Sequence, residues 1–208
     1  MIATGIDFVR AARRVREHIG QRHRYIHILN VARTAVRLAR VHGADPTQAR
    51  TAGLFHDLAR LYPAERLLRE CAERGMPIDG FEHANPIVLH ARLGAALARD
   101  WFGVGDEAIL SAIRKHTVAA ATMSPLDEIL YLADGLEPGR AYAGRAEMLA
   151  LAFDDLATAM KAHLSEALAY QRERQFTPAP QMLAALDHYA HMEPALSECE
   201  GLREKRSA

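Results

Sequence analysis

Hydrophobic residues recur at three- and four-residue intervals along most of the chain, which is the spacing of one face of an α-helix. The segment 24–42 is the clearest case, because Ile28, Val31 and Leu38 fall on one face and Gly43 ends the pattern. The same spacing predicts six further helices and a last short one: about 45–60, 63–75, 86–101, one that begins after Asp106, one that begins after Ser124, about 145–173, and a short helix after Pro180.

Capping residues support the predicted starts of these helices. Asp45 and Ser124 each precede a proline, which places an N-cap residue before proline at the first helical position. Gln48 is positioned to complete a capping box with Asp45. No segment shows the strict alternation of a strand, and no linker or repeat divides the chain. We therefore predict an all-α helical bundle and one domain over 1–208, with C-terminal helices at about 145–192 and a frayed tail at 193–208.

Composition excludes several classes of protein. The 26 basic residues equal the 26 acidic ones, and aromatic residues are few, so the chain lacks the basic surface of a nucleic-acid-binding protein. No apolar run approaches the roughly 20 residues of a membrane span, and the N-terminus lacks the layout of a signal peptide. The two cysteines, Cys71 and Cys199, suggest no disulfide framework. We expect a cytoplasmic protein with neither nucleic acid nor membrane as a partner.

Arginine dominates the basic residues, since all but three of the 26 are arginine. Arginine binds phosphate in a bidentate way, so this bias is compatible with a phosphorylated substrate; a GC-rich genome explains it equally well. The chain contains no P-loop, GxGxxG sequence, nucleophile elbow or HExxH sequence.

Six histidine and aspartate residues fall inside successive predicted helices or at their ends. Asp57 and Asp134 each follow an apolar run, and a carboxylate is expensive to bury unless it is paired or bound to a cation. Imidazole nitrogen with carboxylate oxygen is a ligand set suited to Zn, Fe, Mn, Co or Ni. The candidate metal ligands are therefore His27, His56, Asp57, His90, His116 and Asp134.

The remaining histidines carry less information, because a single histidine in a helix is usually structural. His83, seven residues before His90, is interpreted as a surface residue of a loop. Five others are interpreted as ordinary residues of helix surfaces or ends: His18, His42, His163, His188 and His191.

The order of these residues resembles a known family. His27, His56-Asp57 and Asp134 match the H…HD…D signature of the HD-domain metallohydrolases. A finer pattern resembles one branch of them, the YqeK family of symmetrical diadenosine tetraphosphate (Ap4A) hydrolases. The matching segments span about 20–145, the expected metal-site core, and are RYIH (24–27), GLFHDLAR (53–60), LHARLGA (89–95), AIRKHT (112–117), MSPLDEILYLADGLEP (123–138) and Arg140.

The resemblance implies an HD-domain helical bundle with a dinuclear metal site in its core. Iron is the implied metal, with manganese, cobalt or nickel as alternatives. His27, His56, Asp57 and Asp134 take the positions of the four HD ligands, and Asp57 bridges the two ions. His90 and His116 take those of the two histidines that hold the second metal. The implied reaction cleaves Ap4A into two ADP by a hydroxide that bridges the metals, and the implied catalytic residues are His56, Asp57 and Arg60.

A polyphosphate substrate requires further cations to neutralise its charge. Arg24 lies one helical turn before His27, Arg60 lies one turn after His56, and Arg140 follows the loop after Asp134. Each arginine is alternatively a solvated surface residue. The candidate substrate-binding residues are Arg24, Arg60, Lys115, Thr117 and Arg140, with Arg114 as a weaker candidate.

The chain departs from the family pattern in two places. The family has Thr-Gly after the residues that correspond to His116-Thr117, whereas this chain continues VAAAT at 118–122 and loses the backbone freedom of glycine. The family also commonly has lysine where this chain has Arg60, which changes the reach and geometry of the cation.

Two other functions stay open at this point. One keeps the fold and the metals but hydrolyses another phosphoester, such as a nucleoside monophosphate or a cyclic nucleotide. The other is a non-catalytic nucleotide sensor, against which the complete set of six ligands argues. Exposed apolar faces on the long C-terminal helix would also permit a homodimer.

Overall fold

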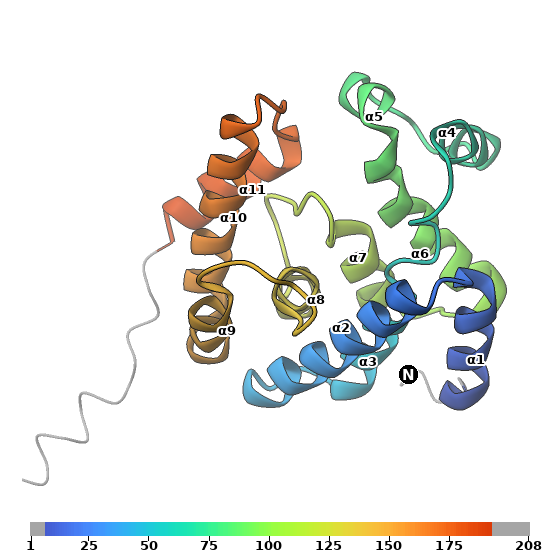
Figure 1. The fold of residues 1–208 in the computed structure, drawn as a ribbon. Coiled ribbons are helices and arrows are strands. Elements are labelled where there is room, and N and C mark those ends of the chain that lie inside the picture. Colours follow the sequence, from blue (N-terminus) through green and yellow to red (C-terminus); the bar gives the residue numbers. More distant parts are fainter. Residues whose placement is uncertain (1–6, 193–208) are drawn as a thin grey trace, which may run out of the picture.

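The computed structural model describes residues 7–192, which form eleven α-helices and one short 3₁₀ helix (Figure 1). No strand occurs within these described residues, so the predicted all-α fold is confirmed. The elements are α1 (Phe8–Ile19), α2 (Arg22–Val41), α3 (Pro46–Phe55), α4 (Ala64–Glu73), α5 (Gly80–Ala84), η1 (Pro86–Val88), α6 (Leu89–Phe102), α7 (Glu107–Lys115), α8 (Pro125–Leu136), α9 (Arg145–Asp154), α10 (Leu156–Glu173) and α11 (Pro180–Ala190).

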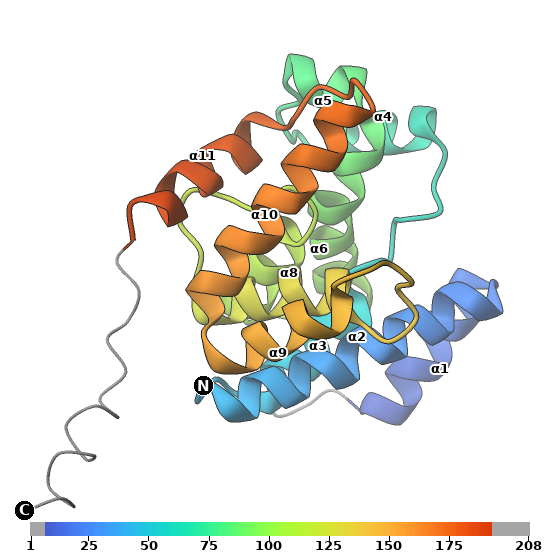
Figure 2. The same ribbon diagram turned by 60° about the vertical axis from the view of Figure 1, so that its left-hand side comes forward.

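Five helices enclose the centre of the molecule. Helix α2 packs along α3 and also contacts α8, while α7 contacts α3, α6 and α8. Helices α9, α10 and α11 follow one another on the outer side of α8, and Figure 2 shows α10 and α11 as a separate outer layer. Among the described residues, no helix is both long enough and apolar enough to cross a membrane. All six candidate metal ligands lie in, or directly after, the five central helices.

Local capping explains several boundaries. The carboxylate of Asp45 accepts the backbone N–H of Thr47, and the Ser124 side chain accepts that of Asp127 in a full capping box, so both predicted N-caps are confirmed. The predicted capping box of Gln48 is wrong. Its side chain donates instead to Asp106 at 2.8 Å, which links the start of α3 to the start of α7.

Two predicted helices end earlier than their hydrophobic pattern indicated. The helix predicted over 45–60 ends at Phe55, and the chain continues in turns through the following residues. The helix predicted over 145–173 is two helices, because Asp155 adopts an extended backbone and its carboxylate caps the N–H of Thr158. Helices α1 and α5 were not predicted, and the predicted tail at 193–208 lies outside the described residues.

A close backbone approach joins α2 to α3. A Cβ atom added at Gly53 would lie 2.6 Å from Cα and 2.9 Å from N of Ala32. Because both atoms belong to the backbone, no side-chain rotation relieves this contact. Gly53 therefore allows the two helices to pack closely directly before the segment that carries His56 and Asp57.

We expect Gly53→Ala to lower the free energy of unfolding by about 2 kcal/mol, because overpacking of the helix contact outweighs the gain in helix propensity. Urea denaturation measures this change. Gly80→Ala is the matched control, since a Cβ atom there meets nothing within 4 Å. A Gly53→Ala protein as stable as the wild type would contradict the packing argument.

Candidate metal centre

The six candidate ligands converge at the centre of the molecule. His27, His56 and Asp134 offer ligand atoms that all lie within 4.8 Å of one another, and so do His56, Asp57 and His116. His56 belongs to both groups and is fully buried, and Asp57 is 2% exposed. The structure therefore brings together residues that five different helices supply.

Asp57 lies between two sets of histidines. Its Oδ2 atom is 3.7 Å from Nε2 of His27 and 3.5 Å from Nε2 of His56. Its Oδ1 atom is 3.5 Å from Nε2 of His90 and 4.0 Å from Nε2 of His116. Each carboxylate oxygen thus faces a different pair of imidazoles, which is the arrangement that a bridging carboxylate requires.

Three of the histidines are oriented by the same backbone contact. In each, Nδ1 donates to the carbonyl oxygen of the residue three positions earlier: His56 to Gly53 (2.8 Å), His90 to Ile87 (2.5 Å) and His116 to Ile113 (2.7 Å). Since a carbonyl oxygen can only accept, the proton of the neutral ring resides on Nδ1. The unprotonated Nε2 atoms therefore point toward Asp57.

His27 is oriented by a carboxylate instead. Its Nδ1 atom donates to Oε1 of Glu137 at 3.1 Å. Glu137 is itself held by the Asn30 side chain at 2.9 Å and by the N–H of Gly139 at 2.6 Å. Carboxylates commonly fix metal-binding histidines in this way. Glu137 is not among the residues predicted from the sequence, although a carboxylate after the apolar run of α8 is the same signal that identified Asp134.

The geometry fits bound metal ions. The Nε2 atoms of His90 and His116 lie 3.1 Å apart, so two lone pairs face each other unless a cation or a proton lies between them. Within the described residues, Nε2 of His27 and Nε2 of His56 are buried and have no hydrogen-bond partner. Unpartnered buried nitrogens of this kind are costly in a core, and coordination to a metal satisfies them.

The protonation states of Asp57, His90 and His116 suit metal binding. Burial lowers the pKa of His116 to about 3 and also lowers the pKa of His90, so both rings are neutral at pH 7. Burial raises the pKa of the Asp57 carboxyl, but His56, His90 and His116 outweigh it and hold this pKa well below its usual range. Burial lowers the pKa of His56, but neighbouring Asp57 outweighs it and raises this pKa above its usual value.

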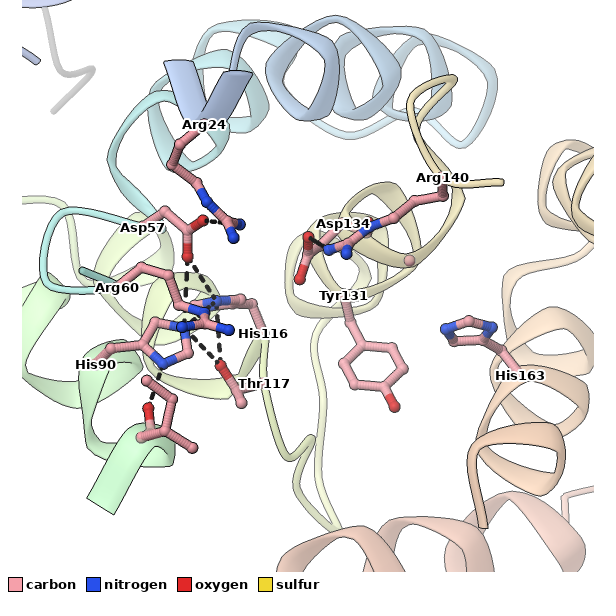
Figure 3. A pocket seen from close by; sticks show the side chains of 12 residues that line it. Arg24, Asp57, Arg60, His90, His116, Thr117, Tyr131, Asp134, Arg140 and His163 are labelled. Atoms are coloured by element: carbon pink, nitrogen blue, oxygen red, sulfur yellow. Dashed lines mark hydrogen bonds and ion pairs between the residues drawn. The ribbon is translucent and has the colours of Figure 1, made fainter. Parts of the chain in front are cut away.

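A pocket of about 280 Å³ opens onto the metal ligands (Figure 3). Arg24, Arg60 and Arg140 all line it, as does Thr117. Arg24 pairs with Asp57 at 3.0 Å, and Arg140 pairs with Asp134 at 2.6 Å. The structure therefore places four of the five candidate substrate-binding residues around one cavity.

Lys115 lies outside the lining of this pocket. Its ammonium group pairs with Asp127 at 2.6 Å and donates to the carbonyl oxygen of Thr122 at 2.9 Å. Asp127 is buried at the start of α8. Lys115 thus connects the end of α7 to the loop that leads into α8.

Four residues that line the pocket were missed from the sequence, namely Ile87, Tyr131, Gly135 and His163. The interpretation of His163 as a surface residue is wrong, because α10 packs on α8 and directs the ring into the pocket (Figure 3). His18 is exposed on α1 and His42 ends α2, as the sequence indicated, and each also hydrogen-bonds a distant carbonyl oxygen, that of Leu58 (2.7 Å) and that of Ala152 (2.8 Å) respectively.

The loop after His116 keeps a glycine-type backbone without glycine. Ala119 has a φ of 58° and is buried. This left-handed conformation costs an L-residue roughly 1–2 kcal/mol. The departure from the family pattern therefore changes the stability of the loop rather than its backbone course at Ala119.

We expect Ala119→Gly to be at least as stable as the wild type. Glycine loses the buried methyl group and makes the unfolded chain more flexible, and both effects destabilise the fold, but relief of the strain at the left-handed φ offsets them. Ala121→Gly is the matched control, since Ala121 is exposed in the same loop and has no positive φ. Thermal denaturation should separate the two variants by about 1 kcal/mol. Equal losses of stability in both would contradict the strain at Ala119.

We expect Asp57→Ala to lower bound metal from about two ions per chain to fewer than one, because one carboxylate faces both sets of histidines. Elemental analysis of freshly purified protein measures this. Asp187→Ala, which changes an exposed carboxylate of α11, should leave the metal content unchanged. Wild-type metal content in Asp57→Ala would refute the bridging assignment.

Comparison with a family model identifies residues 24–139 as an HD domain. This range contains all six candidate ligands and ends two residues after Glu137. In the search of known structures, the chain is similar to a predicted HD superfamily hydrolase involved in NAD metabolism from Clostridium acetobutylicum. The TM-score is 0.85 at 31% identity, and the match covers 88% of this chain and 96% of the other.

Two curated relatives match at the level of sequence, and both are named symmetrical bis(5'-nucleosyl)-tetraphosphatase. The protein from Bacillus subtilis (strain 168) is 43% identical over 138 residues, which cover 66% of this chain and 74% of the relative. The protein from Halalkalibacterium halodurans is 33% identical over 175 residues, which cover 84% and 92%. The chain therefore belongs to the HD-domain family and, within it, to the YqeK branch.

Proposed function

We propose that this chain is a symmetrical bis(5'-nucleosyl)-tetraphosphatase, which hydrolyses Ap4A to two ADP. The observation that carries the proposal is the position of Asp57, whose two oxygens face two pairs of histidines at the base of a pocket lined by three arginines. The printed names of the two relatives give the same activity. This reaction joins water to one of the two central phosphorus atoms and breaks its bond to the bridging oxygen, which leaves with the second ADP.

Two metal ions complete the site in this proposal, and iron is the metal that we infer, with manganese, cobalt or nickel as alternatives. Mixed imidazole and carboxylate ligands suit all four metals. When bound, the ions polarise a phosphate oxygen and make water nucleophilic near neutral pH. His27, His56, Asp57, His90, His116 and Asp134 hold them.

Arg60 is the arginine that is available to the phosphates. It lines the pocket and has no ion-pair partner among residues 7–192, whereas Arg24 and Arg140 are paired with Asp57 and Asp134. A guanidinium binds phosphate oxygens through two parallel N–H donors. Arg60 thus neutralises charge that grows on the phosphates during cleavage.

Arg24 and Arg140 position the two carboxylates. Arg24 binds Oδ2 of Asp57, and Arg140 binds both Oδ1 and the backbone carbonyl of Asp134. Because both arginines also line the pocket, we infer that they contribute positive charge to the binding of the substrate phosphates. They connect the metal ligands Asp57 and Asp134 to the part of the pocket that is lined by arginine.

The departing group requires little acid catalysis. ADP leaves through a phosphate oxygen of low pKa, so a strong proton donor is unnecessary. Thr117, whose hydroxyl lies 3.2 Å from Nε2 of His90 and 3.1 Å from Nε2 of His116, is available to bind an oxygen of the substrate.

The products of Ap4A hydrolysis test the proposed function. Chromatography should show ADP as the sole nucleotide product, because water attacks between the second and third phosphates. AMP with ATP would show asymmetric cleavage. Much faster hydrolysis of a nucleoside monophosphate or a cyclic nucleotide would show that the enzyme acts on another phosphoester. Bound metal without hydrolysis of any of these compounds would indicate a non-catalytic nucleotide sensor.

We expect Arg60→Ala to lower kcat/KM for Ap4A by roughly 100-fold, the usual loss when one donor to a developing negative charge is removed. Steady-state kinetics of ADP release measure this loss. Arg69→Ala is the matched control, because Arg69 is 60% exposed on α4 and pairs only with Glu73 in the described structure. Equal kcat/KM values for the two variants would show that Arg60 does not bind the substrate phosphates.

A further inference from the structure

The pocket above the metal ligands has two chemically different ends. At one end Asp57, Arg60, His90 and His116 lie close together, and the Asp134–Arg140 pair lies between this end and the other (Figure 3). The opposite end is formed by Tyr131 and Gly135 of α8 and by His163 of α10. The charged end matches polyphosphate, whereas the opposite end requires a ligand of different chemistry.

Tyr131 and His163 form an aromatic wall at this opposite end. Their ring centroids lie 5.7 Å apart with an interplanar angle of 76°, so the two rings meet edge to face. Gly135 makes room for the imidazole, because a Cβ atom there would lie 2.4 Å from Nε2 of His163. Gly135, the one glycine of α8, thus lies where this helix faces the histidine.

His163 has a polar atom without a partner. Nδ1 of the ring is buried and has no hydrogen-bond partner within the described residues. A buried polar atom in this state costs about 1–3 kcal/mol. Since this atom has no exposed surface, a bound ligand supplies the missing hydrogen bond once the ring turns its Nδ1 toward the pocket that it lines.

The wall is electrically neutral at pH 7. Burial lowers the pKa of His163, and burial raises the pKa of the Tyr131 phenol. A neutral imidazole and a neutral phenol attract phosphate less than the guanidinium of Arg60 at the other end does. Flat neutral rings instead suit the π-face and the polar edge of a nucleobase.

We propose that Tyr131 and His163 form a subsite for one nucleoside of the substrate, in which Nδ1 of His163 hydrogen-bonds the nucleobase. The inference rests on the proposed function, because it gives that reaction a means of selecting nucleotides over other phosphoanhydrides. A pocket of about 280 Å³ is slightly smaller than the roughly 300–1,000 Å³ of typical small-ligand sites. It therefore has room for at most one nucleoside and its phosphates, and the second half of a symmetrical substrate would extend beyond it.

Binding of ADP and of inorganic pyrophosphate to the manganese-loaded protein tests this subsite, because pyrophosphate carries the phosphates without the nucleoside. We expect the wild type to bind ADP more tightly than pyrophosphate. His163→Ala should weaken ADP binding about tenfold, as loss of a base contact does, and should change pyrophosphate binding less than twofold. Isothermal titration calorimetry measures both affinities without turnover.

Two further variants separate the subsite from general effects on folding. Gly135→Ala keeps the imidazole but displaces it, so ADP binding should again weaken while pyrophosphate binding is retained. His188→Ala changes an exposed histidine of the neighbouring α11 and should alter neither affinity.

Equal weakening of ADP and pyrophosphate by His163→Ala would overturn the proposal, as would unchanged ADP binding in both pocket variants. Wild-type protein that binds the two ligands equally would overturn it too. Ap4A turnover is measured separately. Nucleotide-selective binding that depends on His163, without ADP release from Ap4A, would support the subsite and refute the proposed reaction.

Discussion

The whole site depends on keeping the carboxylate of Asp57 ionised in the interior of a helical protein. An isolated carboxylate would take up a proton there, because burial alone raises its pKa. Four imidazoles and the guanidinium of Arg24 surround it, and the histidines hold its pKa well below the usual range. Two metal ions would extend the same principle, since they concentrate positive charge where the carboxylate oxygens face.

Backbone carbonyl groups orient the candidate metal-binding histidines as much as side chains do. His56, His90 and His116 each donate to a carbonyl of their own preceding turn, so helix geometry alone fixes which nitrogen is free for a metal. His27 lies inside α2, where the carbonyl of the preceding turn accepts a backbone N–H of the helix. Its ring is therefore oriented by Glu137 instead. This difference explains why Glu137 is buried and held by two donors of its own.

The C-terminal helices give the site its second wall. Without α10, the pocket would have arginines and metal ligands on one side and no aromatic boundary on the other. The position of α10 depends on the interruption at Asp155, whose carboxylate starts a new helix in a new direction. Tyr189 of α11 donates to Glu128 at 2.5 Å and holds this layer on α8. Packing outside the metal-site core thus shapes the part of the pocket to which we assign the nucleobase.

The sequence by itself determined the helical class, the N-caps at Asp45 and Ser124 and the order of the six ligands, because each depends on local spacing. Tertiary structure decided which atoms meet. Hydrophobic periodicity registers neither the end of α3 at Phe55 nor the break at Asp155, where a local cap on Thr158 starts a new helix. His163 lies 106 positions after Asp57 in sequence, and only the packing of α10 on α8 directs its ring into the same pocket. Contacts between distant segments have no local signal, so the aromatic wall was visible only in three dimensions.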